Sequence, residues 1–164
     1  MAEPTPETDL TVAPMPADTC DAITWDAPAT DHPARRASQG SYAAVSRGVF
    51  EDWIALYAPD AVIEDPVGPS MFDPDGRGHH GHDAIRRFWD AAIAPITRFH
   101  FLITDSHANG RSCANVGTIT TTFEDGGTVD TDLVMVYTVG EDGLIRSMRA
   151  YWEPDRAMAT YRAG

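Results

Sequence analysis

The chain has 164 residues, 43% of them hydrophobic, and a formal net charge of -13 at pH 7. This length and composition suit one soluble domain with a single core, and the negative charge argues against a nucleic-acid partner because phosphate binding needs a positive protein face. All 12 basic residues are arginines, which excludes Schiff-base chemistry on lysine and a P-loop lysine.

Apolar runs and cysteines indicate the compartment. No uninterrupted apolar run approaches the ~20 residues that cross a bilayer, and the first residues lack the basic start and apolar centre of a secretory signal. The two cysteines, Cys20 and Cys113, lie in segments of very different character, so a disulfide framework is not expected. We therefore expect a cytoplasmic protein without a membrane partner.

The first 36 residues differ in composition from the rest of the chain. Residues 1–34 contain six of the 12 prolines and seven acidic residues, but no arginine and no apolar periodicity. Such a segment cannot bury enough apolar surface to offset the entropy lost on ordering. We predict a disordered acidic arm over residues 1–36, one folded domain over residues 37–158 and a short tail over residues 159–164.

The domain starts with a pattern of two short helices, broken at Gly48. Their apolar residues recur at helical spacing and are Ala43, Ala44, Val45, Val49, Trp53, Ile54, Leu56 and Tyr57. A short strand ending at Asp65 follows, and then a loop rich in Gly, Pro, Asp and His runs from Gly68 to His82. The amphipathic pattern from Ala84 to Ile93 predicts a helix that ends before Pro95.

Four strands are predicted in the second half of the chain, at about 98–107, 114–124, 128–139 and 144–152. They are separated by turn sequences at Asn109-Gly110, Asp125-Gly126-Gly127 and Asp142-Gly143. Helices followed by an antiparallel meander predict an α+β fold in which one face of the sheet wraps around helices.

Asp65, at the end of the first strand, is the main candidate for chemistry. It shares a strand face with Ile63, while Glu64 points the other way, so one of the two acids must lie against apolar neighbours. A carboxyl group beside hydrocarbon holds its proton more tightly than one in water, which suits proton transfer at neutral pH. The alternative is an acidic strand end that simply enters a turn.

The last two strands supply candidates for an apolar pocket. Leu133, Met135 and Tyr137 alternate along one strand, and Met148 and Trp152 share a face of the next. A sheet curved over the helix of residues 82–94 would enclose a pocket beside this face. The alternative is that these side chains only fill the core.

Three segments carry a family resemblance: Leu56–Gly68 with its Glu64-Asp65-Pro66 motif, Gly81–Trp89 and Gly143–Trp152. In combination they resemble the steroid delta-isomerase (ketosteroid isomerase) branch of the NTF2-like, or SnoaL-like, superfamily, over roughly residues 38–158. The resemblance implies a cone-shaped α+β roll with a deep apolar cavity, which is usually a homodimer and needs no metal or cofactor.

The resemblance also implies roles for individual residues. The aspartate of the Glu-Asp-Pro motif, which carries a proton between C4 and C6 of a 3-oxo-Δ5-steroid through a dienolate, falls on Asp65. The pocket residues of the family fall on Trp89, Met148 and Trp152. Together with the strand pattern, this predicts a substrate-binding set of Trp89, Met135, Tyr137, Met148 and Trp152.

Two positions depart from the family pattern. The tyrosine that donates a hydrogen bond to the substrate oxygen falls on Ser41, with Tyr42 beside it, and the second acid falls on Met135, which cannot donate. Asp132 lies on the opposite strand face, and a bulge would be needed to turn it inward. Losing one such donor typically costs about 3–4 kcal/mol of transition-state stabilisation. The candidate catalytic residues are Asp65, Tyr42 and Asp132.

The loop before the third helix contains His79, His80 and His82 beside several aspartates. These side chains are of the types that bind divalent metals, but histidines in a glycine-rich loop are more often solvated than convergent. We expect no metal there, and the loop is a candidate lid over the pocket.

These observations predict an isomerase without a cofactor that acts on a steroid or a similar apolar cyclic ketone, with Asp65 as general base. One alternative is a binding module that holds a hydrophobic small molecule without chemistry, which Met135 favours. Another is a different SnoaL-like activity, such as cyclisation, dehydration or epoxide hydrolysis. The expected partners are a steroid-like ligand and a second copy of the chain.

Overall fold

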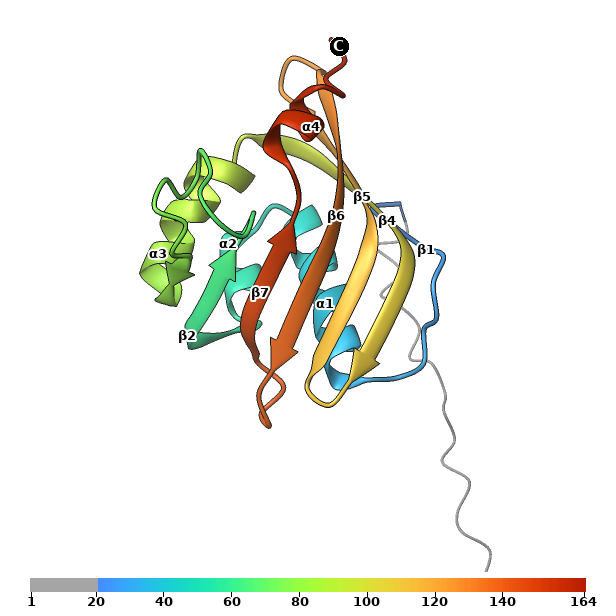
Figure 1. Cartoon of the computed structure of the whole chain (residues 1–164), viewed down its shortest axis with the longest axis vertical. Coiled ribbons are helices and arrows are strands. Elements are labelled where there is room, and N and C mark those ends of the chain that lie inside the picture. Colours follow the sequence, from blue (N-terminus) through green and yellow to red (C-terminus); the bar gives the residue numbers. More distant parts are fainter. Residues whose placement is uncertain (1–20) are drawn as a thin grey trace, which may run out of the picture.

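The computed structural model describes residues 21–164 (Figure 1). In chain order the elements are β1 (Ile23–Trp25), α1 (Pro33–Ser46), α2 (Phe50–Ile54), β2 (Tyr57–Glu64), β3 (His79–His80), α3 (Gly81–Phe88), the π-helical turn η2 (Trp89–Ile93), β4 (Ile96–Asn109), β5 (Ser112–Phe123), β6 (Thr128–Val139), β7 (Ile145–Tyr151) and α4 (Pro154–Met158). Among these residues, no helix has the length and apolar character needed to span a membrane.

Within residues 21–164, seven strands form one sheet in the order β1-β4-β5-β6-β7-β2-β3. Strands β4 to β7 form an antiparallel meander, whereas β2 runs parallel to β7 and β1 runs parallel to β4. The sheet curves, with α1 packed against β4, β5 and β6 and with α3 beside β2 (Figure 1). The predicted α+β fold with a curved, largely antiparallel sheet is confirmed.

Strand β6 shows how the sequence pattern produces an apolar concave face. Its residues alternate between the two faces of the sheet, and Leu133, Met135 and Tyr137 are buried while Asp132 is exposed. The core lies between this face and the first helices, where the ring of Tyr42 in α1 meets the edge of Tyr137 with centroids 5.8 Å apart.

The domain boundary predicted at residue 36 is wrong, because ordered elements begin before it. β1 pairs with residues 101–103 of β4, and Ile23 is only 5% exposed. Helix α1 begins at Pro33, a favourable first helical residue because it has no N–H to leave unpaired. A strand of three residues has no periodicity of its own, so only its partner reveals it. Residues 1–20 of the predicted arm lie outside the described residues.

Smaller differences occur elsewhere in the chain. The helix predicted to include Tyr57 ends at Ile54, and Tyr57 begins β2. The predicted tail of residues 159–164 is tied to the sheet, because the backbones of Thr128 and Arg162 exchange hydrogen bonds of 2.9 and 3.0 Å.

If β1 belongs to the folded domain, then shortening its buried side chain must destabilise the whole protein. We expect Ile23→Ala to lower the free energy of unfolding by about 2–5 kcal/mol, the usual cost of removing a buried isoleucine. The matched control is Thr24→Ala, at an exposed neighbour on the same strand, which should change stability by less than about 0.5 kcal/mol. Urea denaturation measures both; equal small effects would show that β1 does not contribute to the domain.

Candidate active site

Asp65 opens into a cavity of about 220 Å³ on the concave side of the sheet. The walls are mostly apolar and come from the loop after β2, from the α3 and η2 region, from β4 to β6 and from α4; they include Met71, Phe72, Phe88, Ile93, Phe99, Ile119, Leu133 and Met158. Asp65 is the one ionisable side chain among the residues that line this cavity. The predicted pairing of a strand-end carboxylate with an apolar pocket is therefore present.

Within the described part of the chain, one side-chain hydrogen bond holds the Asp65 carboxylate. The indole Nε1 of Trp152 donates to Asp65 Oδ1 at 2.6 Å. Burial raises the pKa of Asp65 above its ordinary value because the charged form loses hydration, and the indole hydrogen bond offsets part of this increase. One carboxylate oxygen is thus oriented by Trp152, which leaves the other without a side-chain donor in the described residues.

Glu64, the neighbouring acid, has a different role. Its Oε2 accepts a hydrogen bond from Arg149 Nε at 2.6 Å, in an ion pair on the opposite face of the strands. Of the two acids at the end of β2, Asp65 is therefore the one that lies against hydrocarbon, as the strand alternation required.

The register of three strands places Asp65 relative to the deeper core. Tyr137 of β6 pairs with Met148 of β7, which pairs with Ile63 of β2. The next inward-facing row contains Met135 and its partner Ala150. Asp65 belongs to this second row, because it follows Glu64, the partner of Arg149. Met148 therefore lies in the deeper row beside Ile63, while Met135 lies in the row of Asp65, on the other side of Ala150.

A group of hydroxyl side chains lies in the buried core. Ser41 Oγ accepts a hydrogen bond from Trp53 Nε1 at 3.0 Å and shares another with Tyr57 Oη at 3.1 Å. Burial raises the pKa of Tyr57 and of Tyr137, and the negative charge of Asp65 raises both further. Both phenols are therefore protonated at neutral pH, and both are close enough to Asp65 to respond to its charge.

The sequence identified only part of this group. The sequence predicts Tyr137 as a pocket residue, whereas the helical spacing places Tyr57 in a helix and gives it no role in the site. Tyr42, a predicted catalytic residue, does not line the cavity. It is buried in the core, where Asn115 Nδ2 donates a hydrogen bond to its Oη at 2.9 Å.

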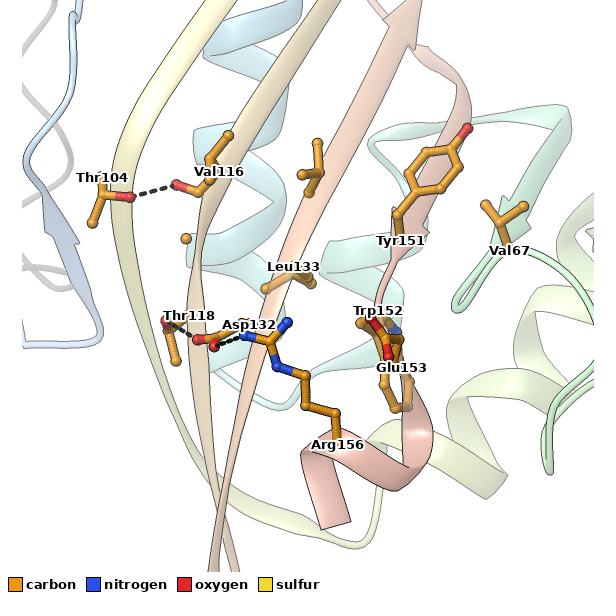
Figure 2. A pocket seen from close by; sticks show the side chains of 12 residues that line it. Val67, Thr104, Val116, Thr118, Asp132, Leu133, Tyr151, Trp152, Glu153 and Arg156 are labelled. Atoms are coloured by element: carbon orange, nitrogen blue, oxygen red, sulfur yellow. Dashed lines mark hydrogen bonds and ion pairs between the residues drawn. The ribbon is translucent and has the colours of Figure 1, made fainter. Parts of the chain in front are cut away.

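Asp132 faces away from the cavity, as the strand alternation indicates, so the structure does not bring this candidate catalytic residue to Asp65. Strands β5 and β6 pair without a register shift along their whole length, and no bulge rotates this residue. Its carboxylate accepts from Thr118 Oγ1 at 2.7 Å and from Arg156 Nη2 at 3.1 Å. Figure 2 shows these contacts in a separate hollow of about 580 Å³ between the outer face of the sheet and α4. Trp152 reaches both this hollow and the cavity.

The predicted substrate-binding residues are divided between the cavity and the core. Trp152 lines the cavity, while Met135, Tyr137 and Met148 lie buried beneath it. Trp89 packs in the core against Trp53, with ring centroids 5.1 Å apart. The aromatic residues of the cavity wall, such as Phe72, Phe88 and Phe99, were not singled out, since only the folded chain brings them together.

The three loop histidines have separate neighbours. The ring of His79 packs against Phe88 with centroids 4.8 Å apart and the ring planes tilted by 37°. His80 Nε2 contacts the carbonyl of Arg77 at 2.8 Å, and His82 Nε2 contacts the carbonyl of Tyr57 at 3.1 Å. Within residues 21–164, no three His, Cys, Asp or Glu side chains are grouped in a way that could hold a metal ion. The loop does contact the cavity, through Phe72.

Known proteins are similar to this chain in fold and in sequence. A steroid Delta-isomerase of Nocardioides simplex is 32% identical over 106 residues, which are 65% of this chain and 78% of the relative. The crystal structure of RV0760c from Mycobacterium tuberculosis is 34% identical with a TM-score of 0.73, covering 84% of this chain and all of the other; the same protein has been solved with estradiol-17beta-hemisuccinate. A Delta 5-3-ketosteroid isomerase from Mycobacterium sp. is 32% identical with a TM-score of 0.72, covering 82% of this chain and 100% of that one.

The family assignment follows from a domain-level match. The family model of the SnoaL-like domain matches residues 39–148. This range extends from the second turn of α1 to β7 and includes Asp65 and most of the sheet. The chain belongs to the SnoaL-like family of NTF2-like domains.

Proposed function

We propose that this protein is an isomerase of the ketosteroid isomerase type, in which Asp65 transfers a proton within a steroid or a similar apolar cyclic ketone. The observation that carries the proposal is the carboxylate of Asp65, which is partly buried, has a raised pKa and opens into an apolar cavity. A general base is most effective when its pKa approaches the working pH, and burial moves Asp65 in that direction.

In the proposed reaction, the Asp65 carboxylate removes the C4 proton of a 3-oxo-Δ5-steroid. The electron pair of the broken C–H bond moves into the ring system and onto the carbonyl oxygen, which gives a dienolate. Asp65 then returns the proton to C6, so that the double bond becomes conjugated and no atom is gained or lost. Trp152 orients the carboxylate through Oδ1, while the apolar walls hold the rings and exclude water.

The size of the cavity limits how such a substrate would enter. A volume of about 220 Å³ is below the usual ~300–1,000 Å³ of ligand pockets, so side chains must move. Met71 and Met158 at the rim are 57% and 56% exposed. Met135 and Met148 are buried in the two sheet rows that contain Asp65 and Ile63. Methionine side chains adapt easily to a new shape. We infer that these four residues rearrange around the ligand.

The relatives support the same substrate class. Two of the similar proteins are steroid isomerases, and a third has been solved with an estradiol derivative. A specific observation favours the alternative, a binding module without turnover: Met135, at the position of the family's second acid, is buried and has no hydrogen-bond donor. The two proposals differ in whether Asp65 breaks a C–H bond.

The direct test follows the absorbance of the conjugated enone while the protein is incubated with a 3-oxo-Δ5-steroid. We expect turnover that rises with pH as Asp65 loses its proton, with a midpoint above the ordinary aspartate pKa of about 3.9. Asp65→Asn should lower kcat by about 10²–10⁴, the usual contribution of a general base. The matched control is Asp60→Asn, at an exposed position on the same strand, which should retain activity. Steroid binding without turnover would instead establish the binding module.

The raised pKa of Asp65 also predicts a change in stability. The folded state binds the Asp65 proton more tightly than the unfolded state, so stability decreases as the pH rises through the folded pKa. At pH 7 the ionised carboxylate opposes folding, and Asp65→Asn should stabilise the protein by about 1 kcal/mol. This gain should shrink as the pH is lowered towards about 4. Urea denaturation at several pH values measures it, and a variant less stable than the native chain at pH 7 would contradict this account.

We also propose a homodimer formed through the outer face of the sheet. Val116, Val134 and Tyr151 lie in one cross-strand row on that face, and the first and last of them are 39% and 44% exposed. The ion pair of Asp132 and Arg156 lies beside this row (Figure 2). A two-fold axis would bring the apolar rows of two copies together and place opposite charges at their edge.

Sedimentation velocity tests the dimer. Val116→Arg places a charge in the middle of the apolar row, and we expect it to convert the dimer into a monomer. Val49→Arg serves as the matched control, because Val49 is 45% exposed at the start of α2, away from this face, and it should not change the mass. A native protein that sediments as a monomer would rule out this interface.

A further inference from the structure

The cavity has hydrogen-bonding side chains in two places, with hydrocarbon between them. Asp65 and Trp152 lie where β2 and β7 end, and Thr121 and Thr131 lie farther along β5 and β6. The other residues that line this cavity are aliphatic, aromatic or methionine. Asp65 and Trp152 are bonded to each other, so the two threonines are the polar groups of the wall that the proposed reaction does not use.

The strand register fixes how far Thr131 lies from Asp65. Along the inner face of β6, Met135 shares the row of Asp65, Leu133 is one row further and Thr131 is two rows further. Inward-facing rows are two residues apart, so Thr131 is about 13 Å from the row of Asp65, measured along the strand. The side chains at both ends reach into the cavity and shorten this span. A fused four-ring ligand with one end at Asp65 is long enough to bring its other end to Thr131.

The two threonine hydroxyls differ in their hydrogen bonds. Thr121 Oγ1 donates to the carbonyl of Val129 at 3.4 Å. Thr131 is half-buried on the cavity wall, and no side-chain hydrogen bond within residues 21–164 involves its hydroxyl. The acids on either side of it, Asp130 and Asp132, point to the other face and accept from threonines of β5 there. A hydroxyl both donates and accepts, so Thr131 suits a ligand carbonyl or a ligand hydroxyl.

The covering of this part of the cavity makes the Thr131 hydroxyl selective. Helix α4 packs against β6, and its residues Ala157 and Met158 line the same cavity. A ligand oxygen that enters here loses water and needs a new hydrogen-bond partner, which Thr131 supplies. A ligand that ends in hydrocarbon would cover the Thr131 hydroxyl without pairing it, and an unpaired buried hydroxyl is costly.

We propose that Thr131 binds an oxygen atom at the end of the ligand remote from Asp65, so that the site selects apolar ring systems with a polar group at each end. In a steroid this is an oxo or hydroxyl group at C17, opposite the C3 carbonyl. The inference rests on the proposed function, because Asp65 fixes which end of the ligand reacts. The remote contact is the same in the ketone and in the dienolate, so Thr131 determines affinity and takes no part in proton transfer.

The kinetic test compares two substrates that differ only at C17. These are 5-androstene-3,17-dione and 5-androsten-3-one, which has no C17 oxygen. Thr131→Val replaces the hydroxyl by a methyl group of similar size. We expect it to raise KM for the 17-oxo substrate about two- to tenfold, the usual net contribution of one neutral hydrogen bond, with kcat unchanged. It should not raise KM for 5-androsten-3-one.

Two further variants serve as controls. Thr131→Ser keeps the hydroxyl and loses only a methyl group, so it should retain the preference for the C17 oxygen even if both substrates bind less tightly. Thr122→Val makes the same chemical change one residue after Thr121, on the opposite face of β5 and outside the cavity wall. It should leave KM for both substrates unchanged.

Equilibrium binding measures the same contact without turnover. Estradiol and 17-deoxyestradiol are matched probes, because neither contains the 3-oxo-Δ5 group that is isomerised and only estradiol has a C17 oxygen. In calorimetric titrations, Thr131→Val should weaken the binding of estradiol about two- to tenfold and change that of 17-deoxyestradiol by less than about twofold. Thr131→Ser should keep the preference of the native protein for estradiol.

The two measurements separate the possible failures. A native protein without turnover, in which Thr131→Val weakens estradiol but not 17-deoxyestradiol, would refute the isomerase and support the role of Thr131. Turnover that depends on Asp65, together with equal effects of Thr131→Val on both members of each ligand pair, would support the isomerase and overturn the role of Thr131. Absence of estradiol binding to the native protein would also overturn that role.

Discussion

The hydrogen bond from the Trp152 indole to the Asp65 carboxylate is the contact on which the site depends. Asp65 directly follows β2 and Trp152 directly follows β7, two neighbouring parallel strands. The contact therefore joins the two strand ends at the cavity and gives the carboxylate one fixed orientation. It also supplies a polar partner for a partly buried carboxylate, without restoring the hydration that would return the pKa of Asp65 to the ordinary value.

The polar side chains on the two faces of the sheet lie in different environments. On the outer face, Asp132 and Arg156 form an exposed ion pair, which contributes little to stability because water and salt screen it. On the inner face, Asp65 lies beside mostly apolar side chains, so its hydrogen bond with Trp152 acts in a medium of low dielectric constant. Side chains alternate between the two faces along β6, so Asp132, three residues before Met135, points to the outer face. Asp132 therefore cannot act at the inner position that Met135 occupies.

Much of the fold was predictable because its signals are local. The four strands of the meander, β4 to β7, and their Gly-containing turns follow from alternation and turn chemistry, and α3 follows from its apolar spacing. β1 was not predictable, because three residues carry no period and the strand exists only through its pairing with β4. The bridge between Thr128 and Arg162 was missed for the same reason.

The sequence by itself determined that Asp65 ends a strand next to Ile63 and that Leu133, Met135 and Tyr137 share one face, since a strand fixes the relative direction of its own side chains. Only the tertiary structure decided which face is concave, that Asp132 lies outside it, and that Tyr42 meets Asn115 rather than the cavity. These outcomes depend on the register between strands and on the packing of α1 against the sheet. Both arise from contacts between residues far apart in the chain, which no local pattern encodes.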